Sequence, residues 1–416
     1  MIVLALYFGL FILSYLIVGS FRRRTHRHDF TSLKTVTFGD ESAIRPDRAA
    51  SAISILTIFL IWGAFTGSRF APFHVPGPFM GQTSFTYTAQ TADGQVDDAV
   101  VHLLVHHAGA KPTPPEITPG DGFAKDDSAI VAAWRSVLLK PVENDGDGVT
   151  ITAINGQAIT PEQKIKVADG TVVLTPKGSL NFEPYKGFQM EPIWLPSPES
   201  VVARFADIAV NGFQNTSLWT HLGASLGRVL AGFALGSLIG IPLGYAMGLS
   251  GWFRGWFDPI VEFMRPVPPL ALIPLVIIWF GIWESGKIVL LFLAALWIMV
   301  IAARSGVSGV RISKIHAAYS LGATRWQIMR HVIIPNSLPE LFTGARVAMG
   351  VCWGTVVAAE LVAAEKGAGM MIIAASKFQM TDVVVMGIIL IGIIGYGIDI
   401  LMRMAETRLV PWKGRG

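Results

Sequence analysis

The sequence predicts an all-α polytopic membrane protein with about seven transmembrane helices and an inserted all-β, sandwich-like domain. Of the 416 residues, 52% are hydrophobic and only 15% are charged, whereas soluble domains carry roughly 25% charged residues. The apolar residues gather into long runs, and runs of about 18 or more predict membrane helices. A middle segment has a different composition, with short alternating runs between turn residues. The chain therefore combines a membrane part with a part of another fold class.

Seven apolar runs are long enough to be membrane spans. Because backbone polar groups must be satisfied internally in lipid, these runs are expected to be helices rather than open strands. The predicted spans cover approximately residues 2–19, 52–69, 221–249, 257–283, 287–305, 338–363 and 382–404.

The first run differs from a secretory signal peptide, because its basic residues follow the apolar stretch instead of preceding it. Arg22, Arg23, Arg24 and Arg27 come after the run. Lys and Arg accumulate in cytoplasmic loops. The order therefore predicts an uncleaved helix with its N-terminus outside and its basic flank in the cytoplasm.

The distribution of Lys and Arg in the other loops agrees with this orientation. The stretches 21–49 and 306–337 and the C-terminal tail carry most of them, and all three fall on one side if the N-terminus is outside. The opposite loops at 284–287 and 364–381 carry only three lysines between them. We therefore expect a multi-pass protein of the bacterial inner membrane with a cytoplasmic C-terminus and a periplasmic middle segment.

These runs define the expected domain boundaries. The single cysteine, Cys352, excludes an internal disulfide and a cysteine-based metal cluster. The expected parts are an extra N-terminal transmembrane helix over 1–20, a basic cytoplasmic linker over 21–51, a first core helix over 52–69, a periplasmic β-rich domain over 70–195, an interfacial helix over 196–220, and five further core helices over 221–416 that include a cytoplasmic loop at 306–337.

Short alternating runs predict strands in the middle segment. The runs Thr83–Thr88, Val100–Val105, Val149–Ile154 and Thr171–Leu174 are separated by Gly-Asp and Asn-Asp turns and by prolines, which is typical of an all-β domain. The segment 196–215 differs, since its apolar residues recur at helical spacing. It predicts either an interfacial amphipathic helix or an ordinary connecting helix.

Two stretches of the middle segment resemble the cadherin-like and immunoglobulin-like repeats of bacterial surface proteins. They read N-D-G-D-G-V-T-I-T-A-I-N-G over 144–156 and D-G-T-V-V-L-T-P-K-G-S-L-N-F-E-P over 169–184. The part that normally ends such a repeat, 81–95 here, comes first. We therefore expect one β-sandwich whose halves appear in permuted order. The acidic turn residues allow calcium binding, but solvated turns are the preferred interpretation for Asp97, Asp98, Asp145 and Asp147.

The stretch K-I-H-A-A-Y-S-L-G-A-T-R-W-Q-I-M-R-H-V-I-I-P over 314–335 stands out among the predicted cytoplasmic segments. Its small residues Ala317 and Ala318 predict a short helix, Gly322 predicts a break, and a basic amphipathic helix is expected to follow and to end at Pro335. Such a helix-turn-helix is either a docking surface for a partner or a solvated loop.

This stretch resembles the E-A-A…G…I-x-L-P loop of importer permeases of the binding-protein-dependent ABC class. Ala317 and Ala318 match the two alanines, Gly322 matches the glycine, and His316 stands where the family often has glutamate. The resemblance implies a coupling helix that docks in a groove of a separate ATPase subunit. The residues that it assigns to this ATPase-coupling surface are His316, Ala317, Ala318, Leu321, Gly322, Ala323, Thr324 and Arg325.

The resemblance extends from about residue 196 to residue 416 and narrows to the nitrate, sulfonate and taurine group. The runs that carry it are L-G-R-V-L-A-G-F over 226–233, F-M-R-P-V-P-P-L-A-L-I-P-L-V-I-I-W-F-G over 263–281, W-G-T-V-V-A-A-E-L-V-A-A over 353–364 and L-V-P-W-K-G over 409–414. Within the group, the second and third runs look most like taurine permeases. The resemblance implies a six-helix type I ABC importer permease core, to which the first helix and the β-rich domain are additions.

Ionisable residues inside apolar spans usually face a cavity or a partner. Glu262 and Arg265 are three residues apart and can pair on one helix face. The prolines that follow them must break the helix and free carbonyl groups, as in the solute pathways of transporters; a kink with a local salt bridge is the alternative. The candidate translocation-pathway residues are Arg228, Glu262, Arg265, Pro266, Pro268, Pro269, Arg346 and Glu360, with Asp399 as a further ionisable group.

The sequence offers no nucleotide site of its own. Gly281–Lys287 has the G-x4-G-K spacing, but Ile288 replaces the Ser or Thr that follows in a phosphate-binding loop, and the stretch lies between two predicted spans. We therefore expect a transport subunit rather than an enzyme, with no cofactor or metal in this chain. ATP and magnesium are expected in two copies of an ATPase partner.

The further expected partners are a second copy of this chain, a periplasmic solute-binding protein and membrane lipid, with no nucleic acid. The expected cargo is taurine or a related alkanesulfonate. Nitrate, bicarbonate or cyanate would suit the same architecture. An ion-coupled secondary transporter using Glu262, Glu360 and Asp399, or a membrane-anchored adhesion or sensor protein, remains an alternative.

Overall fold

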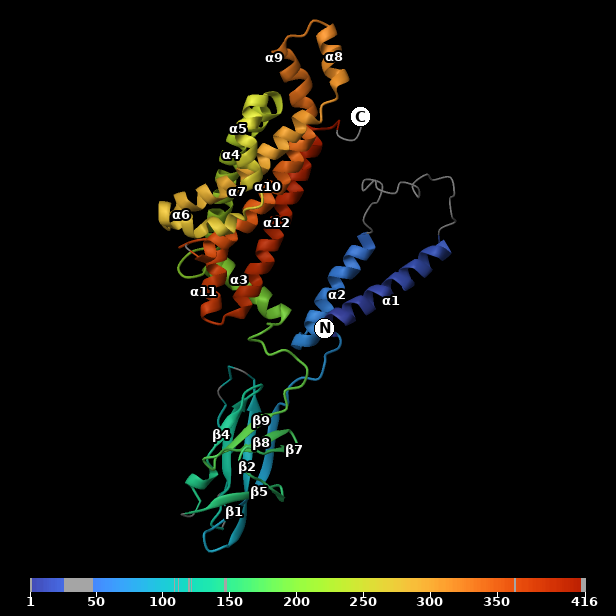
Figure 1. Ribbon diagram of the computed structural model, residues 1–416. Coiled ribbons are helices and arrows are strands. Elements are labelled where there is room, and N and C mark those ends of the chain that lie inside the picture. The colour runs from blue at the N-terminus through green and yellow to red at the C-terminus, as the bar shows by residue number, and fades with distance from the viewer. Residues whose placement is uncertain are drawn as a thin grey trace. The chain divides into compact units, whose positions relative to one another are not determined.

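The computed structural model describes residues 2–25, 48–107, 109–110, 112–118, 120, 122–145, 148–362 and 364–412. The chain divides into two compact units, Met1–Glu199 and Ser200–Gly416. Figure 1 shows the helices and strands of both units.

The first unit begins with two helices, α1 (Ile2–Thr25) and α2 (Arg48–Thr66). They contact each other, and the Tyr7 and Ser54 hydroxyls lie 2.6 Å apart across the contact. Helix α2 is long and apolar enough to cross a membrane, whereas the apolar part of α1, Leu4–Val18, is shorter. The predicted linker over 21–51 is too long, because α1 continues to Thr25 and α2 already begins at Arg48. Arg27 lies outside the described residues.

The rest of the first unit contains two β-sheets. One has the strand order β3-β2-β1-β5-β6 and the other β4-β9-β8-β7. Strands β2 and β3 are parallel, and every other paired set of these strands is antiparallel. A short 3₁₀ helix, η2 (Pro141–Glu143), follows β4. The strands are β1 (Gly81–Gln90), β2 (Val96–His106), β3 (Asp127–Ala132), β4 (Val137–Leu139), β5 (Thr150–Ile154), β6 (Gln157–Ala158), β7 (Lys164–Val167), β8 (Gly170–Leu174) and β9 (Leu180–Pro184).

Both sheets contribute to one hydrophobic core. Side chains alternate between buried and partly exposed along β1, β2 and β9, as expected when one face of each strand is covered. Phe85 of the first sheet stacks on Phe182 of the second, with ring centroids 6.0 Å apart. The predicted β-rich domain is therefore present as two sheets around a shared core, named the β module below. The permuted order of its halves stays a prediction.

A cluster of acidic residues lies beside the β-module core. The buried Tyr87 hydroxyl donates to the Asp145 carboxylate at 3.1 Å and to the Lys125 carbonyl at 2.9 Å. Burial raises the pKa of Asp145 and of Asp127, and neighbouring carboxylates raise both further. Asp147 lies outside the described residues. Among the described residues, no group of three or more His, Cys, Asp or Glu side chains is placed to hold a metal ion.

The second unit is helical. The span predicted at 221–249 corresponds to α4, which starts at Leu218 because Ser217 caps it by accepting a hydrogen bond from the Thr220 N–H. Its helices are α3 (Pro198–Asn211), whose first two residues precede the boundary between the units, α4 (Leu218–Leu249), α5 (Gly251–Met264), η3 (Pro269–Leu272), α6 (Ile273–Phe280), α7 (Glu284–Ser308), α8 (Ile312–Ser320), α9 (Arg325–Ile328), η4 (Met329–Ile333, a π-helical turn), α10 (Ile334–Val362), α11 (Ala368–Lys377) and α12 (Thr381–Leu409).

The predicted interfacial helix over 196–220 is shorter in the structure. Helix α3 ends at Asn211, where Gly212 adopts φ = 77° and its N–H donates to the Ile208 carbonyl. A positive φ of this kind ends a helix most readily at glycine. An antiparallel bridge between Phe213 and Thr216 then leads into α4.

Helices α4 and α7 approach each other through glycines at every fourth position of α4. A Cβ added at Gly232 would lie 2.3 Å from Leu291 Cβ, and one added at Gly244 would lie 2.4 Å from the Val300 carbonyl oxygen. Gly236 and Gly240 lie in the same row. Because small residues let membrane helices pack backbone to backbone, this glycine row sets the central contact of the unit.

The span predicted at 257–283 is broken, as its prolines indicated. Helix α5 begins earlier, at Gly251, and ends at Met264; the axis then bends by 90° into η3 and α6. Pro266, Pro268 and Pro269 occupy the bend. Across the described residues, five helices are long and apolar enough to cross a membrane, or six if α5 and α6 form one broken span. The sequence predicted seven, and the difference is the short apolar part of α1.

Candidate functional site

The predicted docking loop forms a helix-turn-helix. Helix α8 ends in a Schellman motif: the Gly322 N–H donates to the Tyr319 carbonyl at 2.9 Å, and the Ala323 N–H donates to the Ala318 carbonyl at 3.0 Å. Gly322 adopts φ = 77°, a conformation that favours glycine. The helix break predicted at Gly322 is present. The positive φ at this position explains why a glycine occupies it.

Helix α9 begins with a capping box. The Thr324 hydroxyl accepts a hydrogen bond from the Gln327 N–H, and the Gln327 side chain accepts one from the Thr324 N–H at 2.8 Å. Thr324 is therefore a helix cap, and its neighbour Arg325 is the first residue of α9. The two caps satisfy backbone groups on both sides of the turn between α8 and α9, and the Lys314 side chain ties α8 to Asn336 at 2.7 Å.

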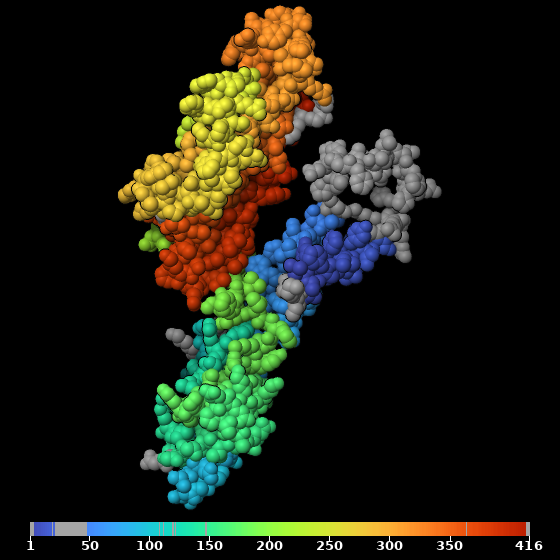
Figure 2. Space-filling model, viewed as in Figure 1, coloured from blue at the N-terminus to red at the C-terminus, as the bar shows by residue number. Residues whose placement is uncertain are grey.

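The turn exposes several large apolar side chains. The side chains of Ile312, Tyr319 and Trp326 are mostly exposed, and Leu321 is 88% exposed. Figure 2 shows the α8–α9 segment standing out at one end of the second unit. His316, Ala317 and the other predicted coupling residues lie on this protrusion. Apolar side chains held out by a rigid turn are typical of a protein-docking surface.

The predicted end of the second helix at Pro335 is wrong. The helix continues through the π-turn η4 into α10, and residues 325–362 form one helical stretch. The π-turn widens the helix just before Pro335, where the Ile334 N–H donates to the Met329 carbonyl. The Asn336 side-chain amide also donates to the Val332 carbonyl at 2.6 Å. A proline near a π-turn can therefore be accommodated without ending the helix.

A partly buried ion-pair cluster lies at the opposite end of the second unit, near α11, and its Glu284 side chain is 59% exposed. The Arg228 guanidinium of α4 donates to Glu360 of α10 at 2.6 Å and to Glu284 of α7 at 2.5 and 2.7 Å. Arg228 is only 5% exposed and Glu360 only 1%. Lys287 also reaches Glu284, at 3.1 Å. These four residues are named the Arg228 cluster.

The segment between α10 and α11 is tied to α4 beside this cluster. The Ser225 hydroxyl donates to the Glu360 carboxylate at 2.8 Å and accepts the Ala368 N–H at 3.0 Å. His221, one helical turn before Ser225, accepts the Gly367 N–H through Nδ1 at 3.2 Å. The Gly369 N–H at the start of α11 donates to Glu360. The N-terminus of α11, the Ser225 hydroxyl and the Arg228 guanidinium thus all stabilise the buried Glu360 carboxylate.

The candidate pathway residues therefore fall into four places. Arg228 and Glu360 are brought together inside the Arg228 cluster and are satisfied by other groups of the chain. Glu262 lies on α5 and Arg265 directly follows it. Arg265 Nη1 is 3.9 Å from Glu262 Oε2, and both side chains are exposed. Arg346 pairs elsewhere, with Asp399 of α12 at 3.2 Å. The three prolines lie in the bend after α5.

Sequence reasoning missed Arg304, Asp258 and Glu284. Arg304 of α7 pairs with Asp258 and, at 3.1 Å, with Glu262. A signal for Arg304 was present, because it is a charged residue at the end of the predicted span 287–305. Its partner could not be deduced, since the two helices meet only in the folded chain.

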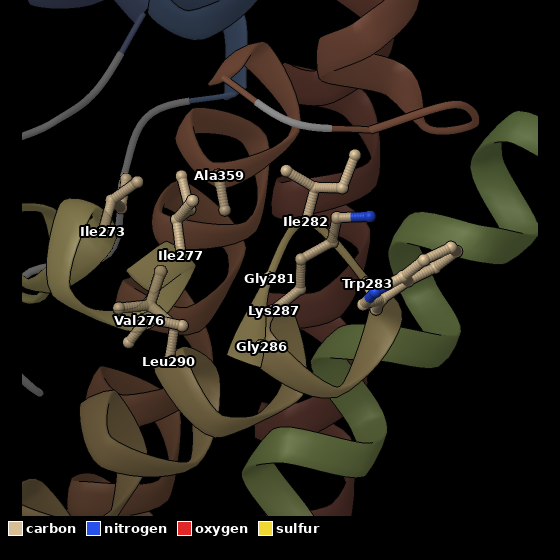
Figure 3. A pocket seen from close by; sticks show the side chains of 10 residues that line it. All are labelled: Ile273, Val276, Ile277, Gly281, Ile282, Trp283, Gly286, Lys287, Leu290 and Ala359. Carbon is tan, nitrogen blue, oxygen red and sulfur yellow. The ribbon is translucent and has the colours of Figure 1, made fainter. Parts of the chain in front are cut away.

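The stretch Gly281–Lys287 comprises the turn between α6 and α7 and the first residues of α7, which begins at Glu284. It lines a small recess of about 20 Å³, which has room for about one water molecule (Figure 3). Helix α6 precedes Gly281, whereas a phosphate-binding loop follows a strand. This geometry supports rejection of the stretch as a nucleotide site.

Comparison with known proteins agrees with the motifs. Residues 236–411 match the family described as binding-protein-dependent transport system inner membrane component. The taurine transport system permease protein TauC of Escherichia coli is 47% identical over 226 residues, which are 54% of this chain and 82% of that protein. The chain belongs to this family. It is the permease subunit of an ABC importer and a multi-pass membrane protein, and ATP hydrolysis belongs to a separate subunit.

Other permeases of the group are also similar. The putative aliphatic sulfonates transport permease protein SsuC of Escherichia coli is 39% identical over 219 residues, 53% of this permease and 82% of that protein. The nitrate import permease protein NrtB of Leptolyngbya laminosa is 30% identical over 154 residues, 37% of this permease and 55% of that protein. Inward-facing conformations of the MetNI methionine ABC transporter match at a TM-score of 0.41 and 22% identity, over 47% of this permease and 96% of that chain. Helices α1 and α2 and the β module lie outside the family match.

Proposed function

We propose that this permease moves taurine or a related alkanesulfonate into the cytoplasm by alternating access. Two copies form the pathway, each copy docks one ATPase subunit, and a periplasmic solute-binding protein delivers the solute. The observation that carries the coupling role is the exposed, doubly capped α8–α9 turn. A turn that is held rigid by its own caps can transmit the motion of a partner into α10.

In this proposal the ATPase contacts the α8–α9 turn through Leu321 and the neighbouring residues His316, Ala317, Ala318, Gly322, Ala323, Thr324 and Arg325. ATP and magnesium bind in the ATPase. Binding and hydrolysis of ATP move the turn, and the permease alternates between inward-open and outward-open states.

The proposed orientation places the α8–α9 end of the second unit in the cytoplasm and the α11 end outside. The supporting observation is the concentration of Lys and Arg in the stretches 21–49 and 306–337. The N-terminus and the β module would then be periplasmic, and the membrane would be the bacterial inner membrane.

The proposed substrate class is supported by the 47% identity to a taurine permease and the 39% identity to a sulfonate permease. Nitrate, bicarbonate and cyanate are the alternative solutes for the same architecture.

The test reconstitutes the permease with its ATPase and binding protein in liposomes and measures ATP-driven uptake of labelled taurine. We expect Leu321→Asp to abolish co-purification of the ATPase and to lower uptake at least tenfold. Since Leu321 is 88% exposed, the fold should be unaffected. The control is Val210→Asp on α3, where the replaced side chain is 84% exposed. Normal uptake by Leu321→Asp would refute the coupling role, and uptake driven by an ion gradient without the ATPase would establish the secondary-transporter alternative.

A further inference from the structure

Helix α5 has three distinct faces. Val261 points into the second unit, where it packs with Met247 of α4 and Val300 of α7. Trp252, Trp256 and Phe263 form an exposed aromatic face. The third face combines small and charged residues at helical spacing and borders a shallow, open hollow of about 520 Å³, named the groove below. Its lining residues all belong to α5; they are Gly251, Arg254, Gly255, Asp258, Pro259 and Glu262.

These faces suit different surroundings. The aromatic face suits lipid, whereas a row of charged groups within a membrane span is expensive unless it faces water or a partner. Helix α5 is part of the broken span that passes the length and hydropathy criteria for crossing a membrane. The small-and-charged face is therefore expected to face an aqueous space at membrane depth.

The charges of this face are not fully balanced, because three arginines, Arg254, Arg265 and Arg304, lie beside two carboxylates. Arg304 of α7 pairs with Asp258 and with Glu262, the second at 3.1 Å. Arg254 and Arg265 reach the same carboxylates only at 3.9 Å, which is too long for a hydrogen bond. Their side chains are 62% and 64% exposed. Arg304 thus occupies both carboxylates and leaves two exposed guanidinium groups.

We propose that this groove lines the solute path and that Arg254 and Arg265 bind the anionic group of the solute in turn. The proposal rests on the proposed function. A guanidinium group forms paired hydrogen bonds with a compact oxyanion such as a sulfonate. The two arginines are 11 residues apart in sequence, about 16 Å along a helix, so they form successive stations. Arg304 is a positioning residue that keeps the carboxylates from neutralising them.

The first test measures water access with single cysteines in the reconstituted complex. The probe is 2-sulfonatoethyl methanethiosulfonate, a charged thiol reagent that carries an ethylsulfonate group. Gly255→Cys places a thiol in the groove, where an added Cβ meets no other atom within 4 Å. Trp256→Cys is the neighbouring control on the aromatic face. The unaltered chain is the background control, because its one cysteine, Cys352, is buried.

We expect Gly255→Cys to be labelled at least tenfold faster than Trp256→Cys, and taurine to slow that labelling at least fivefold. Equal rates at the two positions, or no labelling of Gly255→Cys with or without ATP, would overturn the proposal. So would a spontaneous disulfide between two Gly255→Cys copies without labelling, because the groove would then be a contact between subunits.

The second test separates binding from folding. Arg254→Gln and Arg265→Gln should each raise the KM for taurine uptake about tenfold with unchanged yield of the complex, and Arg254→Lys should recover part of the loss. Arg304→Gln should raise the KM as well, although Arg304 contacts no solute. Unchanged KM values for both Gln variants at Arg254 and Arg265 would overturn the proposal.

The outcomes distinguish this inference from the proposed function. If the unaltered complex takes up no alkanesulfonate but Gly255→Cys is labelled, the groove is supported and the proposed substrate is wrong. If the complex takes up taurine and Gly255→Cys stays unlabelled, the proposed function holds and the groove is wrong.

Discussion

The β module and the helical unit differ in the side chains that form their main internal contacts. The β module buries large residues, among them Tyr87, Leu103 and Phe182, none of which is exposed. The main helix contact of the second unit instead uses glycines, such as Gly236 and Gly240, against the backbone of α7. In water, burial of large apolar surface drives folding, whereas lipid gives no such drive between helices and close backbone packing replaces it. The contrast indicates that the β module is adapted to water and the helical unit to lipid.

The largest expected effect comes from filling the glycine row. A Cβ at Gly236 would lie 2.6 Å from Ala295 Cβ and 2.9 Å from the Phe292 carbonyl oxygen. Gly236→Leu should therefore force α4 and α7 apart and abolish the yield of folded permease in size-exclusion chromatography. The control is Gly227→Leu on the same helix, where an added Cβ meets nothing within 4 Å. Equal yields for the two variants would refute the role of the row.

The second prediction concerns the Arg228 cluster. Removal of one partner leaves a buried charge unpaired, which destabilises by about 3–5 kcal/mol. Arg228→Leu should therefore lower the free energy of unfolding by this amount, whereas Arg228→Leu with Glu360→Leu should be less damaging than the sum of the single changes. The measurement is chemical denaturation in detergent.

The matched control for this prediction is Arg403→Leu. Arg403 also pairs with a carboxylate, Asp399 at 2.8 Å, but its side chain is exposed, and exposed pairs are worth about 0–1 kcal/mol. Additive effects of Arg228→Leu and Glu360→Leu would contradict a direct coupling between the two groups.

The third prediction tests whether the β module has its own core. A fragment of residues 75–190 should fold alone, with a β-type circular dichroism spectrum. Leu103→Ala in this fragment should cost about 2–5 kcal/mol, as expected for a buried leucine. The control Leu138→Ala removes an exposed leucine and should change stability by less than about 0.5 kcal/mol. A helical spectrum of the fragment would contradict the fold.

The smallest effect is expected at Asp127 in the same fragment. Burial, together with the nearby Asp145 and Asp126 carboxylates, raises its pKa above the ordinary value of 3.8. The folded state therefore binds the proton more tightly, so the stability that this group contributes is present at low pH and is lost as pH rises through the raised value. Among the described residues, Asp127 Oδ2 has no hydrogen-bond partner.

Asp127→Asn removes this charge and should stabilise the fragment by about 1 kcal/mol at pH 7. The gain should shrink as pH falls towards 3.8 and below. Thermal unfolding between pH 3 and pH 8 measures this difference. A gain that is constant with pH would show that the carboxylate charge is not its cause.

Sequence reasoning predicted the order of the parts well. Apolar runs placed the spans of the second unit, the prolines after Arg265 predicted the broken span, and Gly322 predicted the turn after α8. These are local signals, since each depends on residues adjacent in the chain. The prediction that the helix ends at Pro335 was wrong because residue types alone do not reveal the π-turn that accommodates this proline.

The pairing of residues that are distant along the chain could not be predicted from the sequence. Arg228 and Glu360 belong to two of the runs that resemble the nitrate, sulfonate and taurine group, yet nothing in either run shows that their side chains meet. The four-residue spacing of the glycines on α4 is visible in the sequence, but the sequence does not show that α7 is the helix they contact. Glu262 was expected to pair with Arg265 and Asp258 was not singled out, because their partner Arg304 comes from a helix more than 40 residues later.

The unbroken stretch from Arg325 to Val362 also has a mechanical consequence. Its 38 residues span about 57 Å at the helical rise, with the α8–α9 turn at one end and Glu360 near the other. Under the proposed function, this continuous helical stretch would link the α8–α9 turn to Glu360 of the Arg228 cluster through its backbone hydrogen bonds. The π-turn η4 lies near the α9 end of this stretch, where the backbone hydrogen bonds change from the i→i−4 to the i→i−5 pattern.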